Sequence, residues 1–350
     1  MKKKEETVLP LSPLNKNTLE KVLSFILEQN SAFVLYKLPN NKDIHLLVST
    51  EFNEETFVLE YFNSKQKTLI NGSSFINDGI LKVLDLSLKN NIEHNKDETN
   101  IYNTQQEYES YVQDIVNLCK ENKMSKCVAA RKIKYHLKKP LSLAATFLKA
   151  CNLYKNTFVH LSNSNFGLWL GASPELLLEK NGFSYKTVSL AGTKTTNRAW
   201  TAKEYDEQKI VTNYIIDSLK NKKVENLQVS DVYTTNASHL MHLKTDISCQ
   251  TKNELNILDA LHPTPAVCGL PKTEAQNFIE KSEIYNRNFY AGYIGKKDNI
   301  GFYYVNLRCM QIFEKHTDIY VGAGITKDSN PEKEWKETEE KSKVMKKLLE

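Results

Sequence analysis

The chain has 350 residues, of which 40% are hydrophobic and 25% are charged, which is ordinary for a soluble globular protein with a sizeable core. Lys and Arg outnumber Asp and Glu by 47 to 42, and a net charge of +5 is too small an excess to predict a nucleic-acid partner. The sequence contains no run of about 18 apolar residues, so it predicts no membrane span. The basic start MKKK lacks the apolar stretch of a signal peptide that would follow it. The six cysteines form no CxxC pair, so we expect neither a zinc site nor a redox motif, but a cytoplasmic protein with reduced thiols.

The first hundred residues predict mixed structure with little chemical signal. Apolar residues at helical spacing predict a helix over 18–28, and short apolar runs predict strands over 32–38, 44–48 and 56–61. Residues 90–106 are polar and Asn-rich, which predicts an exposed loop. Because residues 1–104 lack a clear core of their own, we interpret them as the less recognisable N-terminal part of one domain that spans 1–350.

The remaining chain mixes helices with hairpin-like strands. Helices are expected over 107–120, 142–151 and 203–219, and a last helix should begin at Asn330 as N-cap with Pro331 in its first position. Strands are expected over 126–135, 157–160, 166–170, 183–190, 300–307 and 319–321. Because the strands do not alternate strictly with helices, the pattern predicts an α+β fold.

Two of the predicted helices carry paired acids. Glu204 and Glu207 lie three residues apart, as do Glu334 and Glu337, and Lys341 follows one turn later. Two such pairs facing each other would suit Mg²⁺, a hard cation that prefers oxygen ligands and keeps some of its waters. The spacing alone does not establish a metal site, because acid pairs of this kind usually lie on a solvated surface.

Several short segments combine tight turns with polar groups. The segment GASPE at 171–175 places an acid after a turn, and LAGT at 190–193 ends a strand with a glycine that lets backbone approach a ligand. Residues 261–271, LHPTPAVCGLP, hold three prolines and a glycine and predict a rigid loop. The segment VGAGI at 321–325 would expose backbone N–H groups to an anion. Each segment taken alone is also compatible with ordinary turn chemistry.

Taken in order, GASPE, AGT, HPTPAVCGLP, YAGYIG, LR, GAGI and NPEKEWKETEEK resemble the chorismate-utilising enzymes. That family includes isochorismate synthases, salicylate synthases, anthranilate synthase large subunits and aminodeoxychorismate synthases. The resemblance runs from about residue 125 to residue 341. It implies the fold of anthranilate synthase component I, in which two large, mainly antiparallel sheets pack together with helices outside.

The resemblance also implies how metal and substrate would be held. Glu207 and Glu337 would bind Mg²⁺, while Glu204 and Glu334 would hold metal-bound waters or support the ligands. The ion would bridge these acids and the ring carboxylate of chorismate, which removes their mutual repulsion. Substrate contacts are implied for Gly192, Thr193, His242, Thr264, Tyr290, Arg308, Gly322 and Lys341.

The proton chemistry implied by the resemblance falls to Lys126 and Glu175. In isochorismate synthases, the lysine deprotonates a water that attacks ring carbon 2, while the glutamate protonates the hydroxyl leaving carbon 4. A lysine acts as a base only in its neutral form, which desolvation or a neighbouring cation favours. An exposed strand lysine is the commoner role for this residue type.

Two positions favour isochorismate synthase within the family. Aminodeoxychorismate synthases carry a nucleophilic lysine where this chain has Ala191, and anthranilate synthases usually carry glutamine where it has Lys126. We therefore predict isomerisation of the small molecule chorismate to isochorismate, feeding menaquinone or siderophore synthesis, without a glutamine amidotransferase subunit. Salicylate synthase and a non-catalytic chorismate-binding protein remain alternatives.

The chain also departs from the family pattern. Residues 194–198 read KTTNR where many relatives have an Arg-Pro-Arg-like run. Gln208 stands where relatives usually have histidine, and Asn288 replaces a common glycine. These departures concern the positioning of substrate rather than the proposed base, acid or metal ligands.

Overall fold

The computed structural model describes residues 14–92, 100–194, 199–237, 240–252 and 254–350. The helices in these ranges are α1 (Lys16–Glu28), the 3-10 helix η1 (Asn77–Asp85), α2 (Gln105–Lys120), α3 (Leu143–Leu153), α4 (Ala202–Asn221), α5 (Glu254–Leu261), α6 (Lys272–Ser282) and α7 (Pro331–Leu349). The strands of the first half are β1 (Phe33–Lys37), β2 (His45–Ser49), β3 (Glu55–Glu60), β4 (Lys67–Ile76), β5 (Lys126–His136), β6 (Phe158–Ser164) and β7 (Gly167–Ser173). The strands of the second half are β8 (Leu176–Asn181), β9 (Ser184–Lys194), β10 (Glu225–Val229), β11 (Tyr233–Ala237), β12 (Leu240–Gln250), β13 (Gly269–Leu270), β14 (Tyr293–Lys296), β15 (Ile300–Val305), β16 (Cys309–Ile312) and β17 (His316–Ile325).

The described strands pair antiparallel in one continuous order. One half of the order is β12–β9–β8–β15–β14–β3–β4, with β10 and β11 both paired to β12. The other half is β2–β1–β6–β7–β16–β17–β5–β13. The pairing of β2 with β4 joins the two halves, so the strands of residues 33–76 lie in the middle of the order.

The corner between the halves lies at Gly72 in β4. This residue pairs with Ser49 of β2 and with Glu55 of β3, so β4 changes partners at this point. A Cβ at this position would lie 1.8 Å from the Val48 carbonyl oxygen, so only glycine lets the strands approach this closely.

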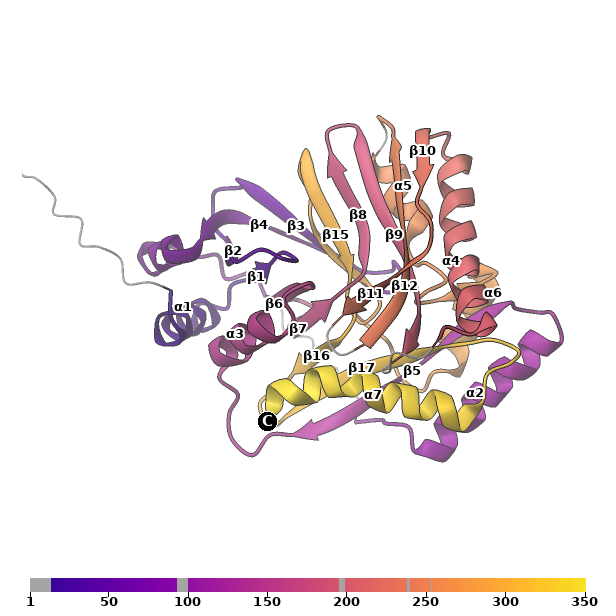
Figure 1. The fold of residues 1–350 in the computed structure, drawn as a ribbon. Coiled ribbons are helices and arrows are strands. Elements are labelled where there is room, and N and C mark those ends of the chain that lie inside the picture. The colour runs from indigo at the N-terminus through magenta and orange to yellow at the C-terminus, as the bar shows by residue number, and fades with distance from the viewer. Residues whose placement is uncertain (1–13, 93–99, 195–198, 238–239, 253) are drawn as a thin grey trace, which may run out of the picture.

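The two halves then face each other as two layers (Figure 1). The ring of Phe158 in β6 stacks on that of Tyr304 in β15 with centroids 4.6 Å apart, although these strands are far apart in the pairing order. The expectation of two large antiparallel sheets packed together is therefore confirmed, with the addition that one pairing order runs through both.

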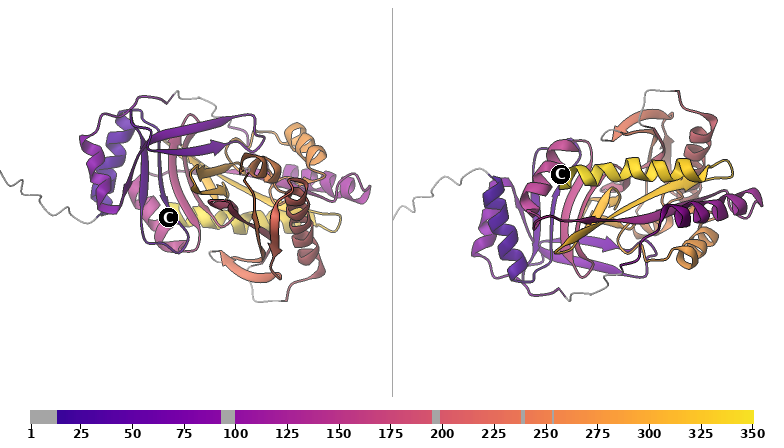
Figure 2. Two further views of the ribbon diagram at one scale, coloured as in Figure 1. Left: turned by 90° about the horizontal axis from the view of Figure 1, so that it is seen from above. Right: turned by 90° about the horizontal axis from the view of Figure 1, so that it is seen from below.

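Helices cover the outer faces of the sheets, as expected. Helices α2 and α7 pack together and lie along β5 and β17, and α4 packs on β9 and β12 (Figures 1 and 2). The last helix begins as predicted, because the Asn330 side chain accepts a hydrogen bond from the Lys333 N–H and Pro331 follows. Among the described residues, none of the helices combines the length and apolar character that a membrane crossing needs.

The loop was predicted to run over residues 90–106, but its last two residues belong to the following helix. Helix α2 already begins at Gln105, with Thr104 and Glu107 forming a capping box at its N-terminus. Residues 93–99 lie outside the described part of the chain, and Asn100 and Ile101 are exposed.

Candidate active site

One cavity between the sheets and helices α4 and α7 contains about 680 Å³ of empty space and opens to solvent. Predicted site residues from many separate elements line it: Lys126, Glu175, Gly192, Glu207, His242, Tyr290, Arg308, Gly322 and Lys341. Ala191, which the sequence analysis used to disfavour an aminodeoxychorismate synthase, also lines the cavity.

The remaining predicted residues lie beside this cavity. Glu337 pairs with Lys341 at 2.7 Å, and Glu334 is buried against Lys203. The Glu204 carboxylate accepts the Thr201 N–H at 2.7 Å and caps α4, so one of its oxygens already has a structural role. The structure describes no side chain for Thr193, which lies in β9.

Lys126 is the first residue of β5 and its side chain is 1% exposed. Its Nζ lies 2.8 Å from Glu207 Oε1, so the proposed base is paired with a proposed metal ligand. Gly324 of β17 makes room for both groups, because a Cβ there would lie 2.4 Å from Glu207 Oε1 and 2.8 Å from Lys126 Cε. Burial alone would raise the pKa of Glu207, but the Lys126 ammonium, followed by Lys341, brings it below its ordinary value.

Glu175 has the properties of an acid that is protonated near neutral pH. It lies in the turn between β7 and β8 and is 4% exposed. Burial raises the pKa of Glu175 to about 7, against the opposing influence of Lys126, Thr264 and Arg308. Thr264, a predicted site residue, is buried but does not line the cavity, and its Oγ1 has no hydrogen-bond partner among the described residues.

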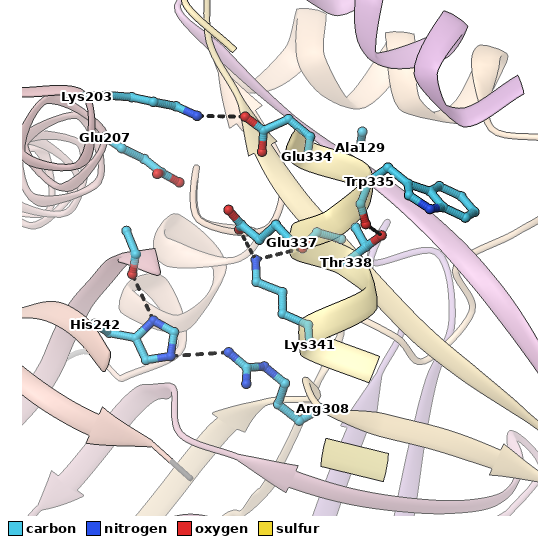
Figure 3. A network of polar contacts seen from close by, with 12 residues as sticks. Ala129, Lys203, Glu207, His242, Arg308, Glu334, Trp335, Glu337, Thr338 and Lys341 are labelled. Carbon is cyan, nitrogen blue, oxygen red and sulfur yellow. Dashed lines mark hydrogen bonds and ion pairs between the residues drawn. The ribbon is translucent and has the colours of Figure 1, made fainter. Parts of the chain in front are cut away.

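His242 and Arg308 form one polar unit in the cavity wall (Figure 3). The Nδ1 of His242 lies 2.9 Å from the Gly192 carbonyl oxygen and therefore donates to it, which leaves Nε2 to accept from Arg308 at 3.2 Å. Burial, helped by Arg308, lowers the pKa of His242 to about 3, so the ring stays neutral. Burial lowers the pKa of Arg308 to about 10, which still leaves the guanidinium charged at neutral pH. Arg308 has a φ of 48°, a backbone conformation that non-glycine residues mainly adopt where function requires it.

Helices α4 and α7 bring the predicted acids face to face. Figure 3 shows Glu207 of α4 and Glu337 of α7 pointing into the space between the two helices. Burial and the Glu337 charge raise the pKa of Glu334, against the effect of Lys203, which shows that these carboxylates repel each other. A divalent cation in this space would relieve that repulsion, so the donor set fits Mg²⁺. No three His, Cys, Asp or Glu side chains of the described ranges converge as a metal cluster, so substrate oxygens and waters would have to complete the coordination.

The structure explains two of the three departures from the family pattern. Gln208 is buried and donates to the Ser189 carbonyl of β9 at 3.1 Å, so it fixes α4 against the sheet instead of facing substrate. Asn288 has a φ of 51°, which asparagine tolerates better than most residues and which accounts for glycine at this position in relatives. Residues 195–198 lie outside the described ranges.

Sequence reasoning missed Lys203 and the role of Gly324. Lys203 donates to Glu334 at 2.7 Å across 131 positions of sequence, and no local pattern could have revealed this pairing. Gly324 belongs to the GAGI motif, so its sequence signal was available, but its function as space for Lys126 and Glu207 was not.

With this geometry established, comparison with known proteins gives the family. A profile of the chorismate binding enzymes matches residues 45–350, and the chain belongs to this family. The match confirms the resemblance seen in the motifs and extends it into the N-terminal part that was harder to recognise.

The relatives include isochorismate synthases. Isochorismate synthase EntC of Escherichia coli is 31% identical over 203 residues, which are 53% of this chain and 52% of EntC. Isochorismate synthase MenF of Pasteurella multocida is 28% identical over 271 residues, covering 70% of this chain and 62% of that protein. The structure of MenF, the menaquinone-specific isochorismate synthase from Escherichia coli, has a TM-score of 0.77 at 21% identity and covers 94% of this chain and 91% of that one. The matched regions thus span between about half and just under two thirds of these curated relatives, and the structural likeness shows the fold.

Proposed function

We propose that the protein is an isochorismate synthase that isomerises chorismate in a magnesium-dependent reaction. The observation that carries the proposal is the meeting of Lys126 and Glu175, both buried, in the wall of one cavity. Water attack at ring carbon 2 needs a base, and departure of the hydroxyl at carbon 4 needs an acid. The two residues supply these functions from different elements, β5 and the turn after β7.

The cationic groups of the cavity suit a substrate with two carboxylates. Arg308 is held by His242, which is neutral and accepts its hydrogen bond, so the guanidinium keeps donors for a substrate carboxylate. Lys341 donates to the Gly322 carbonyl at 2.8 Å, which places its ammonium at the cavity wall near the backbone of β17. These groups would bind and orient chorismate without taking part in proton transfer.

Glu207 and Glu337 would hold Mg²⁺, with Glu334 and Glu204 beside them. When bound, the ion would neutralise the ring carboxylate and the facing acids. Glu207 is the acid that joins this set to the proposed base, because its Oε1 lies 2.8 Å from Lys126 Nζ.

The cavity wall also disfavours an amine nucleophile or a covalent intermediate. Ala191 is buried in the wall at the position of the nucleophilic lysine of aminodeoxychorismate synthases, and a methyl group cannot attack a ring carbon. The buried Lys126 would instead favour water, so we propose no requirement for a glutamine amidotransferase subunit.

Further aspects of the proposal concern organisation and location. The continuous strand order through residues 33–325 supports one chorismate-binding domain over 1–350. All six cysteines are buried and unpaired, which supports action in the reducing cytoplasm. Product isochorismate would feed menaquinone or siderophore synthesis.

The test is incubation of the purified chain with chorismate and Mg²⁺, followed by chromatography of the products. Isochorismate formation that stops in excess chelator is expected. Salicylate with pyruvate as the main products would identify a salicylate synthase instead, and binding of chorismate without turnover would identify a non-catalytic protein.

A further inference from the structure

The strand that carries Lys126 has an edge that other strands leave open. Along one side, β5 pairs with β17 from Cys127 to His136. On the other side, β13 pairs with it only at Lys126 and Cys127, and the Val128 N–H then donates to the Cys268 carbonyl at 2.7 Å. None of the described strands continues this pairing, although unpaired buried backbone groups are costly.

Two side chains from the segment after α6 take the place of a strand. Arg287 Nη2 donates to the Val128 carbonyl at 2.7 Å, and Glu283 Oε1 accepts the Ala130 N–H at 3.2 Å. The two side chains also bond to each other, Nε to Oε2 at 2.8 Å and Nη2 to Oε1 at 2.5 Å. They are 2% and 3% exposed, so this buried ion pair extends the hydrogen bonding of β5.

Arg287 also holds a second wall of the cavity. Its Nη1 donates to the Val267 carbonyl at 2.7 Å. Val267 lines the cavity and belongs to a turn closed by hydrogen bonds from the N–H groups of Val267 and Cys268 to the Thr264 carbonyl. Glu175 lines the same cavity as Val267. One guanidinium therefore connects the strand of the proposed base with a turn that forms part of the cavity wall around the proposed acid.

We propose that Arg287, oriented by Glu283, is a positioning residue that fixes β5 against the 264–268 turn and so places Lys126 in the cavity wall that also holds Glu175. This inference rests on the proposed function for the roles of those two residues. Arg287 itself does not line the cavity, and it acts through the backbone carbonyls of Val128 and Val267. A lysine could keep the charge pair with Glu283, but a single ammonium cannot reproduce the planar fork that reaches both carbonyls and the carboxylate.

The first test compares Arg287→Lys with Arg131→Lys. Arg131 is a matched control, because it too is a buried arginine and does not line the cavity. It lies in β5 itself and is bonded to Thr338 and Glu339 of α7. Arg287→Lys should lower kcat by about 10²-fold through misalignment, with KM for chorismate little changed because the groups that hold its carboxylates remain. Arg131→Lys should keep kcat near that of the unchanged protein.

The second test measures backbone amide hydrogen exchange without substrate. In Arg287→Lys, exchange should accelerate at residues 128–130 and 266–268, whereas Arg131→Lys should leave 266–268 unchanged. Unchanged exchange in both segments, or an equal loss of kcat in the two variants, would overturn the inference. If the unchanged protein forms no isochorismate, the proposed function fails, while the exchange measurement still decides whether Arg287 fixes the two segments.

Discussion

Replacing Glu175 by glutamine should lower activity and raise stability at the same time. The carboxyl has a pKa of about 7 instead of 4.5 because it is buried. At pH 7 this raises the protonated fraction from about one in three hundred to about one half, which an acid catalyst needs. An amide cannot protonate the departing hydroxyl, so Glu175→Gln should lose about 10²–10⁴ in kcat, equally in both directions of the reaction.

The stability effect follows from the same pKa difference. A carboxyl whose folded-state pKa is raised binds its proton more tightly in the folded than in the unfolded chain. Its contribution is fully present below about pH 4.5 and is lost as the pH rises through 7. The free energy of unfolding of the unchanged protein should therefore fall by about 3 kcal/mol relative to Glu175→Gln between these limits, at about 1.4 kcal/mol per pH unit.

The assay is chemical denaturation at several pH values, together with the pH profile of kcat/KM. A falling limb of kcat/KM near pH 7 should be present in the unchanged protein and absent from the residual activity of the variant. Glu179→Gln in β8 is the control, because its side chain is 45% exposed and lies outside the cavity wall, and it should change neither property. Parallel stability curves for Glu175→Gln and the unchanged protein would refute a burial-raised pKa, and retained turnover would refute the role as acid.

Three further predictions test the other parts of the site. Lys126→Ala should lose about 10²–10⁴ in turnover in both directions while chorismate binding and the equilibrium ratio stay unchanged; full turnover would make it an ordinary strand lysine. Glu207→Gln or Glu337→Gln should abolish turnover with the fold intact, judged by circular dichroism, whereas Glu340→Gln on a more exposed position of α7 should not; near-normal rates at limiting Mg²⁺ would remove that residue as a ligand. Ammonium salts should yield no anthranilate, because Ala191 and Lys126 favour water, and anthranilate formed as fast as isochorismate would contradict this.

The sequence was most informative where local pattern and geometry coincide. Helix α4 was expected within two residues of its bounds, and the start of α7 was expected at the residue where it lies, because apolar spacing and the Asn330-Pro331 start act locally. The proposed base and acid were found through motifs. The structure brings them into one cavity although they lie 49 positions apart in the sequence, in segments that no local pattern connects.

Strand β12 was missed because its inward-facing positions are not all apolar. Its sequence LMHLKTDISCQ buries His242 and Thr245 among leucine and isoleucine, so the alternation expected of a half-buried strand is obscured. His242 is polar in this position because it supports Arg308 and the Gly192 carbonyl. The residue that weakens the strand signal is thus one that the proposed site requires.

The corner at Gly72 could not be predicted for a different reason. A glycine in a strand indicates a bulge, a bend or a close backbone approach, and sequence alone does not distinguish among these. Here glycine allows the backbone to approach Val48 closely, at the residue where β4 pairs with both β2 and β3. Which strands meet is a long-range property, so the two-layer arrangement came from the family resemblance and not from periodicity.

The charges of the site show most clearly what the sequence leaves open. Sequence reasoning predicted that these acids bind a cation. In the structure, Glu207, Glu334 and Glu337 each already have a lysine partner. The pairs are Lys126 with Glu207, Lys203 with Glu334 and Lys341 with Glu337, and they join β5, α4 and α7. The three pairs carry no net charge, and a divalent cation together with a dianionic substrate would add none. Glu207 and Glu337 would hold the proposed ion, Arg308 and Lys341 would face the substrate carboxylates, and Lys126 would keep its proposed role as the base.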